Sequence, residues 1–167
     1  MALAGACLIW LSVVAVYDFW QRRVPNWLVL AGALVALGAL AAGAQPFDVT
    51  WGSALLGGAA GFLALLLFHL AGLMGAGDVK LAGALGLWVG HTALLPIWVA
   101  ATLLALGHGS LWLLLQRWPV SLRLGQVLFG PQPVARETSA RRVRFIPYAA
   151  YLAVATAVWM VWGRQNL

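Results

Sequence analysis

Charged residues are scarce in this sequence. Aspartate, glutamate, lysine and arginine together make up 8% of its 167 residues, whereas 63% are hydrophobic. Because soluble domains carry about 25% charged residues, this composition excludes a water-soluble globule of this size. The chain instead holds several apolar stretches that approach the roughly 20 residues of a transmembrane helix. We therefore predict an all-α, polytopic membrane bundle that forms a single domain over residues 1–167, with no room for a soluble domain.

Cysteine is nearly absent as well. The single residue, Cys7, excludes a disulfide framework and a cysteine-based zinc site, and its apolar neighbours predict a packed or lipid-facing side chain. Positive charge is also missing before the first apolar run, since Arg22 and Arg23 follow that run. A secretory signal carries its positive charge at the start, so we expect residues 2–17 to be a retained helix with its N-terminus outside.

The apolar stretches predict six membrane crossings. We expect them near residues 2–17, 27–42, 51–73 and 79–90, then from a turn at His91 and Thr92 to residue 118, and finally over residues 147–162. The division of residues 79–118 rests on length. At roughly 1.5 Å per residue, an unbroken helix there would be about twice as long as the bilayer core. A reversal is therefore predicted between Gly90 and Pro96.

Basic residues outnumber acidic residues by ten to four, which gives a formal charge of +6. In a soluble protein this excess suggests nucleic acid, but in a membrane protein cytoplasmic loops collect lysine and arginine. With the N-terminus outside, six crossings place nine of the ten basic residues on the cytoplasmic side and only Arg164 opposite. We therefore expect no nucleic-acid partner. The basic cluster at residues 136–144 is expected to meet anionic lipid head groups.

Only four acidic residues are present, and two of them lie at the ends of apolar helices. Asp18 follows the first helix and Asp78 precedes the fourth, so the two helices between them return the chain to the same, cytoplasmic side. Asp48 lies in a loop on the opposite side, and Glu137 lies in the basic loop. Two carboxylates close together hold one proton between them near neutral pH. Such a pair activates a water and protonates a leaving amine in aspartyl proteases.

Plainer interpretations of the two aspartates stay open. Asp18 could pair with Arg22 one helical turn later, and Asp78 could cap the fourth helix. For the whole protein, the alternatives are a small proton-coupled transporter with the carboxylates as relay groups, and a non-catalytic membrane subunit of a pilus or secretion machine. The serines and the histidines show no nucleophile or metal-ligand spacing, so we expect neither a metal nor a cofactor.

Three short motifs accompany these aspartates. Residues 75–81 read GAGDVKL, Asp18 is followed by RRVPN at residues 22–26, and residues 145–153 read FIPYAAYLA. These motifs resemble those of the prepilin peptidases, or type IV leader peptidases, a family of GxGD membrane aspartyl proteases. Ala149 and Ala150 stand where that family often has glycine. The resemblance implies that Asp18 and Asp78 are the catalytic residues.

The resemblance also implies a substrate and a place. It implies endoproteolysis of a short basic leader from a prepilin or pseudopilin precursor, cut just after a glycine, at the cytoplasmic face of a bacterial inner membrane and near pilus or secretion machinery. Larger family members carry a cytoplasmic segment with two CxxC pairs and also methylate the new N-terminus. This chain, with one cysteine, resembles instead the short forms tied to tight-adherence (Flp) pili, so we do not expect methyltransferase activity.

Residues around the two aspartates have expected supporting roles. Gly75 and Gly77 lack Cβ atoms, so a substrate backbone can approach Asp78 closely. Pro25 suits the first turn of the second helix, where its missing N–H costs nothing. Lys80 either favours the ionised form of Asp78 or anchors the chain at the cytoplasmic side. The candidate supporting residues are therefore Gly75, Gly77, Lys80, Arg23, Pro25 and Asn26.

Overall fold

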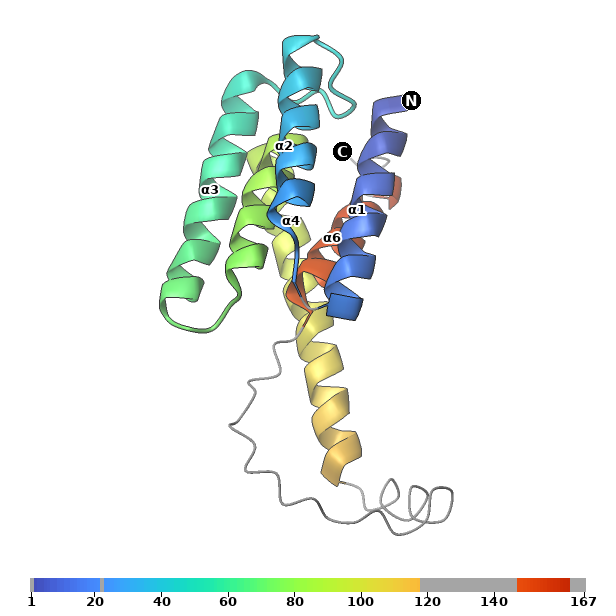
Figure 1. Ribbon diagram of the computed structural model, residues 1–167, viewed down its shortest axis with the longest axis vertical. Helices are drawn as coiled ribbons and strands as arrows, with labels where there is room; N and C mark the ends of the chain where they lie inside the picture. Colours follow the sequence, from blue (N-terminus) through green and yellow to red (C-terminus); the bar gives the residue numbers. More distant parts are fainter. Residues whose placement is uncertain (1, 22, 118–146, 163–167) are drawn as a thin grey trace.

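The structure, a computed structural model, describes residues 2–21, 23–117 and 147–162, with residues 115–117 described by their backbone alone. Every regular element in these ranges is a helix, as predicted. Figure 1 shows them as one bundle. The helices are α1 (Ala2–Gln21), α2 (Asn26–Ala41), α3 (Trp51–Leu70), α4 (Ala76–Arg117) and α6 (Tyr148–Trp162).

The long helix α4 consists of two segments that meet at Gly90. Gly90 has φ 72° and ψ 179°, which breaks the helical path. Glycine adopts positive φ readily because it has no Cβ, whereas most other residues do not. Figure 1 shows the first segment beside α3 and the second segment running back and beyond the bundle. The reversal predicted from the length of residues 79–118 is therefore confirmed, and it begins one residue before His91.

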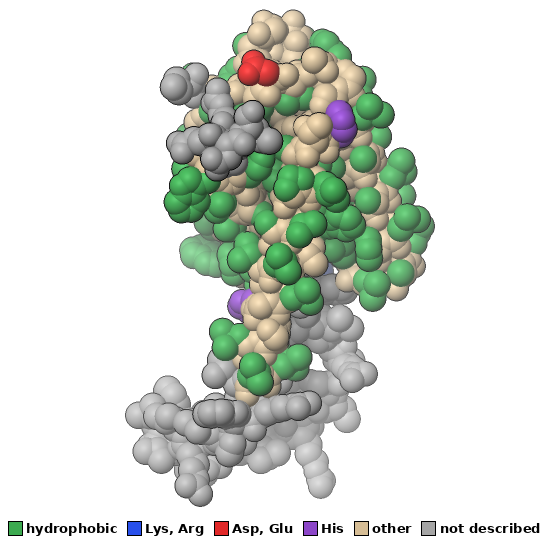
Figure 2. All heavy atoms as spheres, turned by 180° about the vertical axis from the view of Figure 1, so that it is seen from behind, with side chains coloured by type: hydrophobic (Ala, Val, Ile, Leu, Met, Phe, Trp, Pro, Cys, Tyr) green, Lys and Arg blue, Asp and Glu red, His purple; other side chains and the backbone are tan. Residues whose placement is uncertain are grey.

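The lengths and compositions of the helices fit a bilayer. Three described stretches, Ala2–Gln21, Trp51–Leu70 and Ala76–Leu114, are long and apolar enough to cross a membrane, and Asn26–Ala41 and Tyr148–Trp162 are shorter apolar helices. Figure 2 shows hydrophobic side chains spread over the outer face of the bundle. The chain is thus a helical membrane protein. Six crossings and an external N-terminus stay predictions.

Two tryptophans hold α2 against its neighbours. The indole N–H of Trp10 on α1 donates to the carbonyl oxygen of Leu28 at 2.8 Å, and that of Trp88 on α4 donates to Gly32 at 3.0 Å. The two rings stack with their centroids 6.4 Å apart. Because Gly32 lacks a Cβ, the Trp10 ring lies directly on the α2 backbone. These bonds fix the height of α2 relative to α1 and α4.

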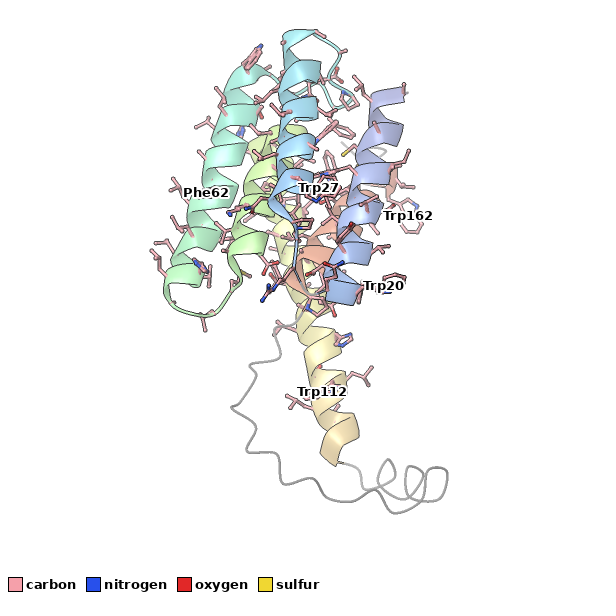
Figure 3. The ribbon with its side chains drawn as sticks, viewed as in Figure 1. Trp20, Trp27, Phe62, Trp112 and Trp162 are labelled. Carbon is pink, nitrogen blue, oxygen red and sulfur yellow. The ribbon has the colours of Figure 1, made fainter. Side chains whose placement is uncertain are left out.

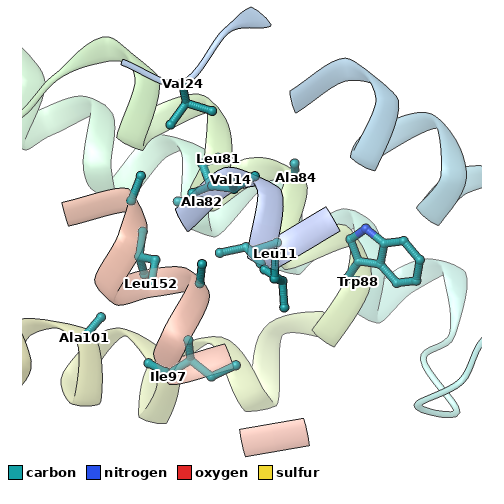
Figure 4. Close-up of a cluster of buried hydrophobic side chains, with 14 of the residues drawn as sticks. Leu11, Val14, Val24, Leu81, Ala82, Ala84, Trp88, Ile97, Ala101 and Leu152 are labelled. Carbon is teal, nitrogen blue, oxygen red and sulfur yellow. The ribbon is translucent and has the colours of Figure 1, made fainter. Parts of the chain in front are cut away.

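The core lies where α1, α4 and α6 meet. Figure 4 shows Leu11 and Val14 of α1 packing with Leu81 of α4 and Leu152 of α6, and all four side chains are at most 2% exposed. Cys7 is also fully buried in this cluster, which confirms the packed apolar environment expected for it. This core sets the spacing of α1, α4 and α6, the three helices that contribute Asp18, Asp78 and the residues next to them.

Candidate active site

Asp18 lies inside α1, in its last turn. The helix continues to Gln21, four residues past the end predicted from hydropathy, so the carboxylate projects from a helix rather than from a loop. The side chain is only 5% exposed. One of its oxygens, Oδ2, accepts a hydrogen bond from the backbone N–H of Ala150 at 2.9 Å. Asp18 is therefore a carboxylate buried between α1 and the start of α6.

Asp78 is the third residue of α4. The helix begins at Ala76, so the N-cap residue is Gly75. The alternative interpretation of Asp78 as the N-cap is therefore wrong. The Asp78 carboxylate accepts hydrogen bonds from the backbone N–H groups of Gly75 and Ala149. The bond to Gly75 is the side-chain half of a capping box. The bond to Ala149 joins the start of α4 to the start of α6.

The N-terminus of α6 brings the two aspartates together. The first N–H groups of a helix have no partner within the helix, and two consecutive ones, on Ala149 and Ala150, donate to Asp78 and Asp18 respectively. The positive end of the helix dipole favours negative charge at the same place. The carboxylates also lie close enough for their charges to interact. The juxtaposition expected from topology is thus present in the structure.

The two backbone donors were missed by the reasoning from sequence. Both belong to alanines that are fully buried, and alanine has no side-chain chemistry to notice. The available signal was Pro147, which directly precedes α6 at Tyr148. Proline is common at the start of a helix, and a helix start presents free N–H groups. What the sequence could not supply was the direction in which they point.

The segment between α1 and α2 packs against the loop before α4. Val24 is 8% exposed, and a Cβ built on Gly77 would lie 3.5 Å from its backbone nitrogen, in ordinary contact. Pro25 directly precedes α2, with φ −68° and ψ 142°, so it is the residue before the first turn of α2 and not, as predicted, a member of that turn. A Cβ on Gly75 would lie 3.3 Å from Oδ2 of Asp78. The two motifs that resemble peptidase motifs are therefore neighbours in space.

Lys80 and Asn26 join these motifs a second time. The Lys80 ammonium donates to Oδ1 of Asn26 at 2.9 Å, and both side chains are exposed. They lie at the edge of an apolar cavity of about 550 Å³ between α2, α3 and α4, and Asp78 does not line it. Within the described residues, no ion pair joins Lys80 to Asp78. That Lys80 favours the ionised form of Asp78 therefore stays a prediction.

Other sequence candidates lie away from the aspartate pair. Asp48 is exposed in the loop between α2 and α3, with φ 53°, and Arg23 is exposed beside Val24. Glu137, the basic cluster at residues 136–144 and Arg22, the proposed ion-pair partner of Asp18, lie outside the described residues. Among the residues that are described, no three histidine, cysteine or acidic side chains group as metal ligands.

An exposed tryptophan lies near the aspartate pair, at the end of α1. Trp20 points away from the bundle (Figure 3) and is 86% exposed. Tryptophan is enriched where a membrane meets water, and Trp20 is two residues from Asp18. The position of Trp20 thus agrees with the prediction that the aspartate pair lies at the ends of apolar helices, and its depth in the membrane stays a prediction.

Comparison with known proteins identifies the family of the chain. The model of the type IV leader peptidase family matches residues 5–110, which is more than half of the chain. The chain belongs to the type IV leader peptidase family. The matched leader peptidase region contains Asp18, Asp78 and all six supporting candidates, and it ends before α6. The backbone N–H groups of Ala149 and Ala150, which together with Asp78 and Asp18 we call the clamp, thus lie outside the matched residues.

A curated relative gives the same result. A protein of Xanthomonas campestris pv. campestris named "Prepilin leader peptidase/N-methyltransferase" is 33% identical over 119 residues, which cover 67% of this chain and 34% of the relative. The chain therefore spans about a third of the length of this curated leader peptidase. No solved structure matches the chain.

Proposed function

We propose that this chain is a membrane-embedded aspartyl endopeptidase that removes the leader from type IV pilin-like precursors, of the Flp type. The observation that carries this proposal is the clamp at α6, where consecutive N–H groups of Ala149 and Ala150 hold Asp78 and Asp18. A protease of this class needs two carboxylates fixed side by side. The family membership and the relative's name support a peptidase acting on prepilins.

The chemistry follows from proton sharing between the two carboxylates. Two negative charges in a poorly solvated site repel each other, so one carboxyl retains a proton near neutral pH. The ionised member takes a proton from a water, which attacks the scissile carbonyl carbon. The protonated member gives its proton to the carbonyl oxygen, which completes a tetrahedral intermediate. When the C–N bond breaks, the member that took the proton of the water passes it to the leaving amine, and the other member takes a proton back from a hydroxyl of the intermediate as the new carboxyl group forms. No metal or cofactor is required for these steps.

The expected place of cleavage is the cytoplasmic face of a bacterial inner membrane. Six crossings would put nine of the ten basic residues on that side, as the positive-inside rule favours, and Asp18 and Asp78 with them. We infer leader cleavage alone. The name of the relative also includes an N-methyltransferase, and we do not extend that activity to this chain.

The test removes the charge of each carboxylate while keeping its size and one acceptor oxygen. The amide oxygen of Asp18→Asn can still accept from Ala150, and that of Asp78→Asn can accept from Gly75 or Ala149, so both variants should insert and fold. We expect each to abolish cleavage of a co-expressed Flp-type prepilin, read as loss of the size shift on a gel. Asp48→Asn is the matched control and should cleave as the wild type does.

The dependence on pH supplies a second readout. Cleavage requires one charged and one protonated carboxyl, so kcat/KM should fall at low pH, where both are protonated, and at high pH, where both are ionised. The profile should be bell-shaped, with limits that belong to the pair. Retained cleavage in either asparagine variant, or a flat profile through the acid range, would sink the aspartyl mechanism.

A further inference from the structure

The hydroxyl of Tyr151 is buried without a hydrogen-bond partner. In the part of the chain that the structure describes, it is one of three such side-chain atoms, with Gln45 Oε1 and Trp98 Nε1. The Tyr151 side chain is only 8% exposed. Buried polar groups are nearly always paired in native proteins, and an unpaired one calls for a specific explanation.

The position of Tyr151 connects it to the aspartate clamp. It follows Ala150, whose N–H holds Asp18, and it lies close enough to Asp18 for that charge to act on its hydroxyl. Its ring packs edge-on against Phe19 of α1, with centroids 6.4 Å apart, and contacts the ring of His108 at 5.9 Å. These contacts fix the ring, so the hydroxyl has a defined place beside the site.

A neighbouring tyrosine, Tyr148, has a buried hydroxyl that does find a hydrogen-bond partner within the protein. The hydroxyl of Tyr148, one helical turn earlier, bonds to the hydroxyl of Thr102 at 3.0 Å and so ties α6 to the second segment of α4. Tyr148 is buried to a similar extent, at 7% exposure. The two side chains therefore differ in whether the protein itself supplies a partner.

We propose that the Tyr151 hydroxyl binds the substrate, by donating a hydrogen bond to a backbone carbonyl oxygen of the peptide held between Asp18 and Asp78. This inference rests on the proposed peptidase function. A peptide brings a carbonyl acceptor at every residue, and a phenol hydroxyl beside a carboxylate is a neutral donor. In a site shielded from water such a bond is strong. Tyr151 would then help to hold the chain in register with the two carboxylates.

The experiment compares Tyr151→Phe with Tyr148→Phe in the full-length protein. Tyr151→Phe keeps the ring contacts to Phe19 and His108 and removes only the unpaired hydroxyl, so the thermal midpoint should stay the same or rise. Tyr148→Phe breaks the bond to Thr102, so its thermal midpoint should fall. The two variants thus separate loss of a substrate contact from loss of an internal contact.

The readouts are cleavage of a purified Flp-type prepilin in detergent and binding of the same prepilin to the inactive Asp78→Asn protein. We expect Tyr151→Phe to raise KM and the Kd by about fivefold to tenfold, the range of one hydrogen bond, with a smaller change in kcat. Tyr148→Phe should leave KM and Kd unchanged for the folded fraction.

Three outcomes overturn the proposal. Unchanged KM and Kd in Tyr151→Phe would mean that a water, not the peptide, meets the hydroxyl. A lowered kcat with an unchanged Kd would mean that Tyr151 acts on Asp18 instead. A fall in thermal midpoint matching that of Tyr148→Phe would give it a structural role. If the wild-type protein binds the prepilin without cleaving it, the proposed function fails, and the Kd comparison still decides the role of Tyr151.

Discussion

At the scale of single residues, the hydrogen bond between Lys80 and Asn26 adds a second possible explanation for the role of Lys80 in cleavage. Lys80 donates to Asn26 at 2.9 Å, so its effect can be mechanical, by joining the segment before α2 to the start of α4. Alternatively its charge can act through space on Asp78, two residues earlier. Both explanations predict that Lys80→Ala slows cleavage less than either aspartate change. They differ in what Asn26→Ala does.

We expect the mechanical explanation to hold in a double-mutant cycle. Lys80→Ala and Asn26→Ala should each lower kcat/KM by about twofold to fivefold, as for one exposed hydrogen bond. The double variant should be no slower than either single variant, because both remove the same contact. The pH–rate profiles of the two single variants should coincide. A shift of the acidic limb in Lys80→Ala alone would show instead that its charge acts on Asp78.

Residue chemistry explains which parts of the site were predictable. Asp18 and Asp78 stand out because acidic side chains are costly in apolar segments, and two helices between them return the chain to one side. Ala149 and Ala150 could not be found in this way, since they act through backbone N–H groups. Every residue except proline carries such a group, and only packing decides where it points.

At the scale of helices, the contact between α3 and α4 depends on glycine. A Cβ on Gly86 would overlap the backbone of Gly57, and one on Gly57 would lie 2.6 Å from the carbonyl oxygen of Gly86. Small residues let membrane helices approach closely and gain dispersion contacts. The start of α4, which carries Asp78, is held in place by this contact with α3.

Gly86→Ala should therefore destabilise the bundle. The added methyl group forces α3 and α4 apart, at a cost of about 1–3 kcal/mol typical of overpacking. Gly38→Ala in α2 is the matched control, since nothing lies within 4 Å of its added Cβ, and it should be neutral or stabilising by up to about 1 kcal/mol. Thermal unfolding in detergent measures both. Equal midpoints for the two variants would mean that α3 and α4 do not pack as described.

Helix limits were less predictable than helix existence. The predicted limits followed hydropathy, which ended the first helix at Tyr17 and began the fourth at Val79. The structure extends α1 to Gln21 and starts α4 at Ala76. A helix does not stop where its residues become polar, because its hydrogen bonds are made within the backbone. The reversal at Gly90 was predictable, since the length of the apolar stretch required it.

At the scale of the whole molecule, topology determines whether the aspartates can share a site. Asp18 lies in the last turn of α1 and Asp78 in the first turn of α4, so the two can meet only if α2 and α3 form a hairpin that returns the chain to the same end of the bundle. The structure has this hairpin, with the α2–α3 loop at the end of the bundle away from the start of α4 (Figure 1). Which end faces the cytoplasm is a prediction from charge alone, based on Arg22, Arg23 and the other basic residues expected on that side.

Cysteine labelling tests this orientation directly. Cys7, the single cysteine, is fully buried, so the wild-type chain should not react with a membrane-impermeant maleimide. Ala44 in the α2–α3 loop and Gln21 at the end of α1 are both exposed, and neither change alters the charge. Ala44→Cys should be labelled in intact cells, whereas Gln21→Cys should be labelled only after the inner membrane is opened. The reverse pattern would place the aspartate pair outside the cytoplasm, where it could not meet a leader before export.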